Sequence, residues 1–252
     1  MTNTLSIKRL FWIVKKEAIE QPLLLLTVSI LVPFVYLMLK GLISHPYAIE
    51  HESIVGLFNI FLFIGGSVFA STAFGDLYDK HKNLSWLMLP ASTLEKFLAQ
   101  LILSTVVYIG FLLLGFFFAS YAANALLQIA LNYDIGWFHP FEPRVWLFIS
   151  KFLFFHALFF LGAAYFKRYV FIKTIAFLFT LMIVICSLFF FVIYSQYPDA
   201  LFTARGVDVQ LSFQFLSDYG QWIRRTVFYL LPPLFWLIAY RKIRRIEADV
   251  AI

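Results

Sequence analysis

The sequence predicts an all-α protein that crosses a membrane several times. Of its 252 residues, 62% are hydrophobic and only 13% are charged, and the mean hydropathy is +0.84. A soluble domain is roughly 45–50% apolar and about 25% charged, so this chain has too few polar residues to cover a globule in water. The composition excludes an ordinary soluble enzyme, a disordered protein and a secreted disulfide scaffold. The one cysteine, Cys186, has no intrachain partner.

Six apolar runs predict six transmembrane helices. Each run is close to the length of about 20 residues that a helix needs to cross a hydrocarbon core about 30 Å thick, or exceeds it. A helix satisfies its backbone hydrogen bonds within itself, as lipid requires, whereas barrel strands alternate in polarity over about ten residues. The predicted spans are residues 22–39, 54–74, 97–119, 145–164, 174–194 and 222–240. Pro232 and Pro233 should kink the last one.

The positions of Lys and Arg predict that both termini are cytoplasmic, because cytoplasmic segments carry an excess of these residues. With both ends inside, most of the 20 Lys and Arg residues fall on the cytoplasmic side. They are Lys8, Arg9, Lys15, Lys16, Lys80, Lys82, Lys96, Lys167, Arg168, Lys173, Arg241, Lys242, Arg244 and Arg245. Topology thus accounts for the net charge of +6, and nucleic acid is not an expected partner.

Residues 6–20 are predicted to form an amphipathic helix that lies along the cytoplasmic membrane surface. Apolar residues recur there at the spacing of one helix face, and charged residues occupy the other side. The apolar face consists of Ile7, Leu10, Phe11, Val14 and Ala18, and the polar side of Lys8, Arg9, Lys15, Lys16 and Glu20. Such a helix places its cations among anionic lipid headgroups. The alternative is a solvated basic tail.

The segment 75–92, between the second and third predicted spans, is the most informative part of the sequence. It begins with a polar helical turn or two and continues as an apolar stretch that ends at Pro90. Ser92 and Glu95 then have the Ser-x-x-Glu spacing of a capping box, which predicts the start of the next helix. Because Leu84 and Trp86 fall near the cytoplasmic surface, the segment is expected to dock another protein.

These features resemble the permease subunit of an ABC transporter of the type-2 exporter family. The likeness rests on the layout and on Leu-Met-Leu-Pro-Ala-Ser-Thr-Leu-Glu-Lys-Phe at positions 87–97. It implies that 1–252 form one permease domain, that 6–20 are an elbow helix, and that 75–92 are a coupling helix inserted into a groove of the ATPase subunit. The implied coupling residues are Asp76, Leu77, Tyr78, Asp79, Lys80, His81, Leu84 and Trp86. The short loop 166–173 is a second implied contact.

The resemblance also implies partners. The chain has no Gly-x-x-x-x-Gly-Lys-Ser/Thr phosphate loop, so it is not expected to be an enzyme or to hold a cofactor. Two copies of a separate ATPase would sandwich ATP and Mg²⁺, and a second permease copy or a homologue would complete the transport path. The expected location is a bacterial cytoplasmic (inner) membrane, among membrane lipid, and the expected activity is export of a substrate by alternating conformations.

Two ionisable residues in the fourth predicted span are candidates for a transport pathway, because a charge inside lipid is costly. Lys151 lies near the outer end, where a snorkelling side chain is the alternative. His156 lies deeper and could line a pathway, pair with a hydroxyl or stay neutral in a helix contact. No acidic residue lies in the middle of a predicted span, which disfavours a carrier that uses buried carboxylates.

Other features leave further interpretations open. The absence of a catalytic cluster disfavours an integral-membrane lipid-modifying enzyme, whereas a membrane immunity or resistance factor remains an alternative to the transporter. No metal-binding motif such as His-Glu-x-x-His occurs.

Gly66 and Ala70 are expected to let two helices approach closely. Residues 122–144 are expected to form an outer loop with some interfacial helix, and 195–221 either a re-entrant helix or a plain loop.

Overall fold

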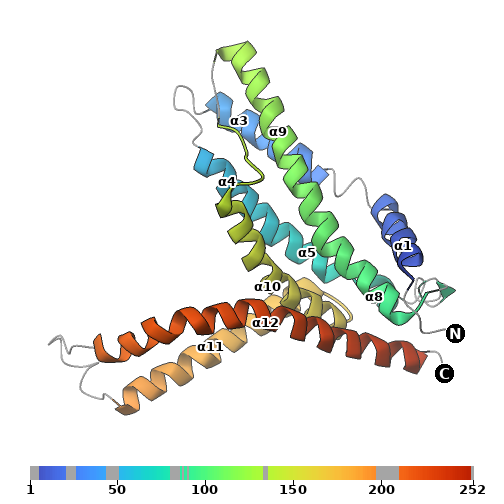
Figure 1. The fold of residues 1–252 in the computed structure, drawn as a ribbon, viewed down its shortest axis with the longest axis vertical. Helices are drawn as coiled ribbons and strands as arrows, with labels where there is room; N and C mark the ends of the chain where they lie inside the picture. The colour runs from blue at the N-terminus through green and yellow to red at the C-terminus, as the bar shows by residue number, and fades with distance from the viewer. Residues whose placement is uncertain are drawn as a thin grey trace.

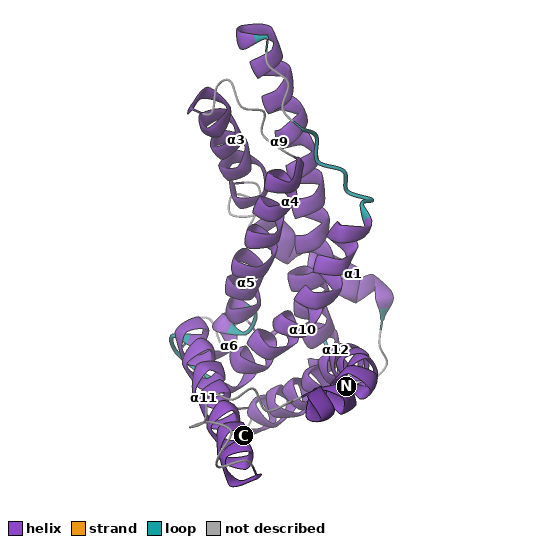
Figure 2. Cartoon of the chain, turned by 90° about the vertical axis from the view of Figure 1, so that its left-hand side faces the viewer, coloured by secondary structure: helices purple, strands orange, loops and turns teal. Residues whose placement is uncertain are grey.

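The structure of the chain is a computed structural model, and it describes residues 6–20, 27–43, 51–79, 86, 88–89, 91–132, 136–196 and 210–250. The regular elements of these residues are all helices, which confirms the predicted all-α fold (Figure 2). They are α1 (Ile7–Glu20), η1 (Thr27–Leu31), α3 (Val32–Ile43), α4 (His51–Ile60), η2 (Phe61–Gly65), α5 (Gly66–Thr72), α6 (Gly75–Tyr78), α8 (Thr93–Ile102), η3 (Leu103–Val107), α9 (Tyr108–Leu131), α10 (Pro143–Tyr165), α11 (Val170–Gln196) and α12 (Gln210–Val250).

Four helical rods among the described residues are long and apolar enough to cross a membrane. They are Glu52–Tyr78, Thr93–Leu131, Pro143–Tyr165 and Val170–Phe191, and they contain the second to the fourth predicted spans and most of the fifth. The first predicted span holds a shorter apolar helix, Ser29–Ile43, and the sixth lies within α12. The chain is therefore a membrane-embedded helical protein. A total of six spans, and cytoplasmic termini, stay predictions.

Two of these rods contain a π-helical turn, η2 between α4 and α5 and η3 between α8 and α9. A π turn uses i→i+5 hydrogen bonds, so the helix widens locally and a carbonyl group becomes available to another partner. The carbonyl oxygen of Phe61 in η2 accepts a hydrogen bond of 2.7 Å from the hydroxyl of Tyr108, which directly follows η3. The two irregular turns are thus joined to each other.

Small residues let the helices approach closely. A Cβ atom at Gly66 would lie 2.4 Å from the ring of Phe152 on α10, and Ala70 is completely buried. The prediction that these two residues allow a close helix contact is confirmed. A second close approach joins α9 to η1, where a Cβ atom at Gly115 would lie 2.2 Å from the carbonyl oxygen of Ser29.

The segment 122–144 differs from the expected outer loop in its first half. α9 continues to Leu131, and Asn132 ends it in the left-handed conformation, with a φ of 54°. The helix extends this far because α9 packs against α3. The chain then returns toward α10 and buries Phe138 beside Phe58, with 5.0 Å between the ring centroids.

The helices form two groups (Figure 1). α3, α4–α5, α9 and α10 form one group, whereas α11 and the first half of α12 diverge from it. α12 continues through Pro232 and Pro233 as one helix, its ribbon bends near the middle, and its second half ends beside α8. Within the membrane-length stretch of each helix, 50% of α10 is buried but only 6% of α11.

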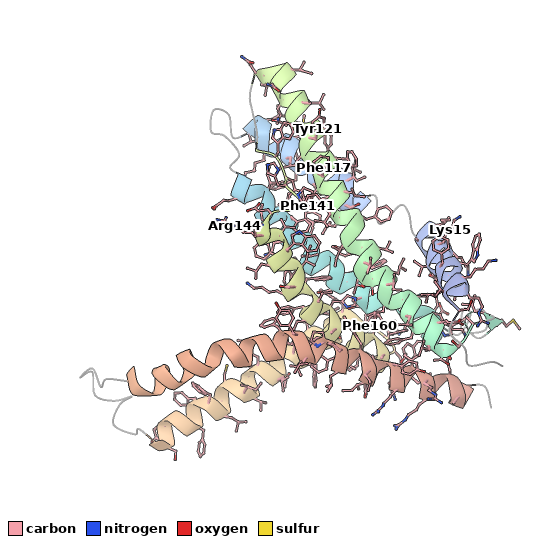
Figure 3. All side chains as sticks on the ribbon, in the orientation of Figure 1. Lys15, Phe117, Tyr121, Phe141, Arg144 and Phe160 are labelled. Carbon is pink, nitrogen blue, oxygen red and sulfur yellow. The ribbon has the colours of Figure 1, made fainter. Side chains whose placement is uncertain are left out.

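The core is divided into two clusters along the molecule. The first surrounds Phe58 and Phe116 and joins α3, α4, α9 and the start of α10. The second surrounds Phe74, Phe97 and Phe160, and joins α5, α6, α8, the end of α10 and the second half of α12. Figure 3 shows Phe160 where α10 passes α12. The second cluster underlies the segment that the sequence singles out for docking.

Candidate functional site

The predicted capping box begins α8. The Ser92 hydroxyl accepts a hydrogen bond of 3.3 Å from the backbone N–H of Glu95, and the Glu95 carboxylate accepts one of 2.8 Å from the backbone N–H of Ser92. This reciprocal pair satisfies two N–H groups that the first turn of a helix leaves without partners. The prediction from the Ser-x-x-Glu spacing is confirmed.

The same Glu95 carboxylate holds α1. It accepts a hydrogen bond of 2.7 Å from the backbone N–H of Ser6 and pairs with the Arg9 guanidinium at 3.1 Å. The Glu95 side chain is fully buried, so these contacts replace the water that its charge would otherwise need. The start of α8 therefore fixes the position of the N-terminal helix.

The predicted amphipathic helix 6–20 is present as α1, but its apolar residues divide between two directions. Leu10, Val14 and Ala18 are half-buried, whereas Ile7 and Phe11 are exposed. Figure 3 shows Lys15 on the side of α1 that faces away from α8 and α9. One row of apolar side chains thus packs on the protein, and the other is free to enter lipid.

A second acid, whose side chain is 11% exposed, holds the C-terminal helix. The residues around it are called here the Glu247 cluster: Glu247, Trp86, Thr93 and Lys96. The Glu247 carboxylate accepts a hydrogen bond of 2.8 Å from the indole Nε1 of Trp86 and another from the Thr93 hydroxyl. It also pairs with the Lys96 ammonium at 3.4 Å. The first turns of α8 therefore hold both α1 and α12.

Trp86 differs from the expectation of an exposed docking residue. Only 4% of it is exposed, and its ring meets Phe74 edge to face, with 6.5 Å between the centroids. The indole N–H is used by Glu247, 161 residues away in the sequence. Trp86 therefore holds the segment 75–92 against the helices and does not offer its ring to a partner.

The other predicted coupling residues fall into three groups. Leu77 is buried, and the Tyr78 hydroxyl donates a hydrogen bond of 2.5 Å to the carbonyl of Ala164 at the end of α10. Asp76 and Asp79 are exposed. The remaining three lie outside the described residues: Lys80, His81 and Leu84. In the described part of the segment, Met88 is also exposed, at 80%.

The two candidate pathway residues lie in different surroundings. Lys151 is exposed on α10, with its ammonium 5.9 Å from the ring centroid of Phe148. This placement is typical of a snorkelling lysine, whose carbon stem lies along apolar groups. His156 is completely buried, and its Nε2 lies 2.9 Å from the hydroxyl oxygen of Ser104 in η3. Only His156 therefore lies in the interior.

The hydrogen bonds of Ser104 determine which ring nitrogen of His156 donates a hydrogen bond and which one can accept. The Ser104 hydroxyl donates to the carbonyl of Gln100 at 2.7 Å, so His156 Nε2 donates to Ser104, and Nδ1 is the acceptor. Nδ1 is buried and has no hydrogen-bond partner among the described residues. The ring stacks on Phe160 with 5.3 Å between centroids. His156 is thus a polar contact between α10 and η3 inside an aromatic core.

Sequence reasoning missed the two acids Glu247 and Glu17. Glu17 is almost completely buried on the inner side of α1. A signal for it exists, because Glu17 follows Val14 by three residues and so shares its helix face. No comparable signal marks Glu247, whose partners lie far away in the sequence.

Among the described residues, no three His, Cys, Asp or Glu side chains come together as a metal site. Comparison of the chain with protein-family models, with curated proteins and with solved structures gives no match.

Proposed function

We propose that the chain is the permease subunit of an ABC transporter of the type-2 exporter family. In this proposal it moves a substrate across a bacterial cytoplasmic membrane by alternating between two packings of its helices. ATP and Mg²⁺ bind to a separate ATPase subunit, present in two copies, and a second permease copy or a homologue completes the path. The chain itself supplies the membrane path and the contact with the ATPase.

The observation that carries the proposal is the attachment of the segment 75–92 to the ends of several helices. Tyr78 joins it to α10, and Trp86 joins it to α12 through Glu247. The start of α8, which follows directly, is joined to α1 through Glu95. A movement imposed on this segment would reach these helices as a rigid body, since each link is a buried or half-buried polar contact. This is the arrangement that a coupling segment requires.

The exposed residues of the segment are the expected contacts with the ATPase. The side chains of Asp76, Asp79 and Met88 are exposed there. Those of Leu77 and Trp86 are buried and anchor the segment to the helices. The division between anchoring and exposed side chains supports a docking role, because a docking element needs a rigid base and an accessible face. Lys80, His81 and Leu84 are expected on the same contact by the resemblance.

Cross-linking in the native membrane tests the proposal. In a Cys186→Ser background, cysteine replaces either Met88, which lies before the start of α8 and is 80% exposed, or Ile129, which lies near the end of α9 and is 85% exposed. A short cross-linker that carries a maleimide and an amine-reactive ester is expected to join Met88→Cys to a lysine of an ATP-binding polypeptide, which is identified by mass spectrometry and by photolabelling with an ATP analogue. Ile129→Cys is the matched control and is expected to give no such product.

Two results would contradict the proposal. One is the same cross-linked ATPase from both cysteine variants, which would show no preference for the segment. The other is ATP hydrolysis by the purified chain alone, which would remove the need for a separate motor.

A further inference from the structure

The second half of α12 has two faces of opposite character. Ala239 and Ile243 are completely buried, and Glu247 continues their face toward α8. The other face is exposed and basic, and it consists of Arg241, Arg244, Arg245 and Ala248. These four positions follow the i, i+3, i+4, i+7 spacing of one side of a helix. The helix therefore packs on the protein with one side and presents three arginines with the other.

The basic face surrounds an open hollow of about 320 Å³, lined by the three arginines and by Ala248. Because alanine has only a methyl group, it leaves the space between the longer side chains open. Within the part of the chain that the structure describes, no ion pair or hydrogen bond is made by these guanidinium groups. A guanidinium offers a planar fork of N–H donors that matches the oxygen atoms of a phosphate group. The hollow thus has the charge and the donors of an anion site.

An apolar stripe leads along the same side of α12 into the hollow. Leu230, Leu234 and Leu237 precede Arg241 at alternating steps of four and three residues, and all three leucines are exposed. Such steps keep side chains on one side of a helix. At 1.5 Å per residue, the leucines extend over about 10 Å. Leucines that continue into arginines match a ligand with an acyl chain and an anionic headgroup, whereas a soluble anion would use the arginines alone.

Exposed tyrosines place the hollow at the level of lipid headgroups. The ammonium of Lys242, which follows Arg241, lies 5.5 Å from the ring centroid of Tyr165 at the end of α10. Tyr169, four residues further on, has the Arg168 guanidinium 4.8 Å from its ring centroid. Both tyrosines are exposed. Exposed tyrosines beside cations are typical of the boundary between membrane and water, where the phosphates of lipids lie.

We propose that this face of α12 binds one anionic phospholipid. The phosphate lies in the hollow between the three arginines, and an acyl chain lies along the three leucines. A general excess of Lys and Arg on one side of the membrane does not require three arginines around one space. The lipid holds the outer side of a helix whose inner side is joined to α8 through Glu247 and Lys96. The inference does not depend on a transport function.

Native mass spectrometry of the purified full-length chain tests the proposal, because it counts bound lipids one at a time. Phosphatidylglycerol is compared with phosphatidylcholine of the same acyl chains, which has a phosphate but no net charge. The first phosphatidylglycerol is expected to bind at least about tenfold more tightly, since each basic residue near the headgroups adds to the attraction. Glycerol 3-phosphate has the phosphate without the acyl chains, and a large excess of it is expected not to displace the lipid.

Variants assign the binding to the hollow. Ala248→Leu fills the space without changing the charge, and it is expected to remove most of the preference for phosphatidylglycerol. Arg245→Gln is expected to weaken phosphatidylglycerol binding about fivefold. The matched controls are Ala122→Leu on α9 and Arg144→Gln on α10, both at exposed positions, and they are expected to keep the affinity of the unchanged protein.

Four results would overturn the proposal. They are equal affinities for the two lipids, equal losses in Arg245→Gln and Arg144→Gln, displacement of the lipid by glycerol 3-phosphate, and a protein dimer that only Ala248→Leu dissociates. The third result would assign the hollow to a soluble anion, and the fourth would assign the face to a second copy of the chain. If Arg245→Gln fails to fold, Ala248→Leu decides the question, because an affinity equal to that of Ala122→Leu would contradict a site in the hollow.

Discussion

At the scale of single residues, one fully buried carboxylate and one largely buried carboxylate hold the two terminal helices. Glu95 binds the backbone of Ser6 and the side chain of Arg9, and Glu247 binds Trp86, among other partners. Both acids lie at the first turns of α8, where the helix dipole favours negative charge. The start of α8 is therefore a natural meeting point for two acids from different parts of the chain.

The Glu247 cluster gives the first prediction. Glu247→Gln keeps the shape of the side chain but leaves the Lys96 ammonium, whose side chain is only 5% exposed, without a counter-charge. The free energy of unfolding is expected to fall by about 1–3 kcal/mol, because a buried charge without a partner retains its desolvation cost. Unfolding of the purified protein in mixed micelles with increasing SDS measures the change.

An exposed ion pair provides the control. Glu52 and Arg144 pair at 2.8 Å between the starts of α4 and α10, and their side chains are 69% and 60% exposed; Figure 3 shows Arg144 beside α4. Glu52→Gln is expected to cost about 0–1 kcal/mol, since exposed pairs contribute little. An equal loss in the two variants would mean that burial does not strengthen the Glu247 cluster.

At the scale of elements, close backbone contacts decide how the helices pack. Gly110 and Gly115 both lie on α9, but only Gly115 faces another backbone, the carbonyl oxygen of Ser29 in η1. A side chain at Gly115 cannot be accommodated by a rotamer change, because the atom it meets is main chain. Helices in membranes depend on such small residues, since lipid provides no hydrophobic force that drives them together.

The second prediction compares these two glycines. Gly115→Ala is expected to lower the free energy of unfolding by about 1–3 kcal/mol, because the new methyl group overpacks the contact between α9 and η1. Gly110→Ala has nothing within 4 Å of the new atom, and it is expected to leave stability unchanged or raise it by up to about 1 kcal/mol through helix propensity. Thermal unfolding of both variants measures the difference, and similar losses in both would contradict the close contact.

At the scale of the whole molecule, both terminal helices lie at one end. α1 and the second half of α12 both contact α8. The last residues of α3 and α9 and the first residues of α4 lie at the opposite end of the molecule (Figure 1). An even number of crossings would give this arrangement, because each crossing changes the side of the membrane. It agrees with the orientation that the Lys and Arg residues predict, but it does not identify the cytoplasmic side.

The third prediction identifies that side. In the Cys186→Ser background, Ile129→Cys is expected to react with a membrane-impermeant maleimide in intact cells, because Ile129 lies at the end of α9 that is predicted to be outside. Met88→Cys is expected to react only after the membrane is permeabilised. Gel-shift detection of the labelled protein measures both. Labelling of Met88→Cys in intact cells would reverse the orientation and remove the basis for an ATPase contact at the segment 75–92.

Several features of the fold follow from the sequence because they depend on local interactions. Four of the predicted spans follow from the length of the apolar runs, since lipid admits few alternatives to a helix. The start of α8 follows from Ser92 and Glu95, which interact within one helical turn. The contact at Gly66 follows because only a small residue permits the approach that Phe152 makes. The boundary of α9 does not follow, because packing on α3 extends the helix beyond the predicted end.

The sequence alone determined that this chain is an all-helical membrane protein with a helix at its N-terminus and a docking candidate before α8. Only the tertiary structure decided which polar residues meet. Trp86 became an anchor because Glu247 reaches it from 161 residues away, and Glu17 entered a cavity because α1 turns that face toward α5 and α8. The physical reason is that hydropathy reports how much surface a helix buries, whereas contacts between helices depend on the rotation and crossing of each helix.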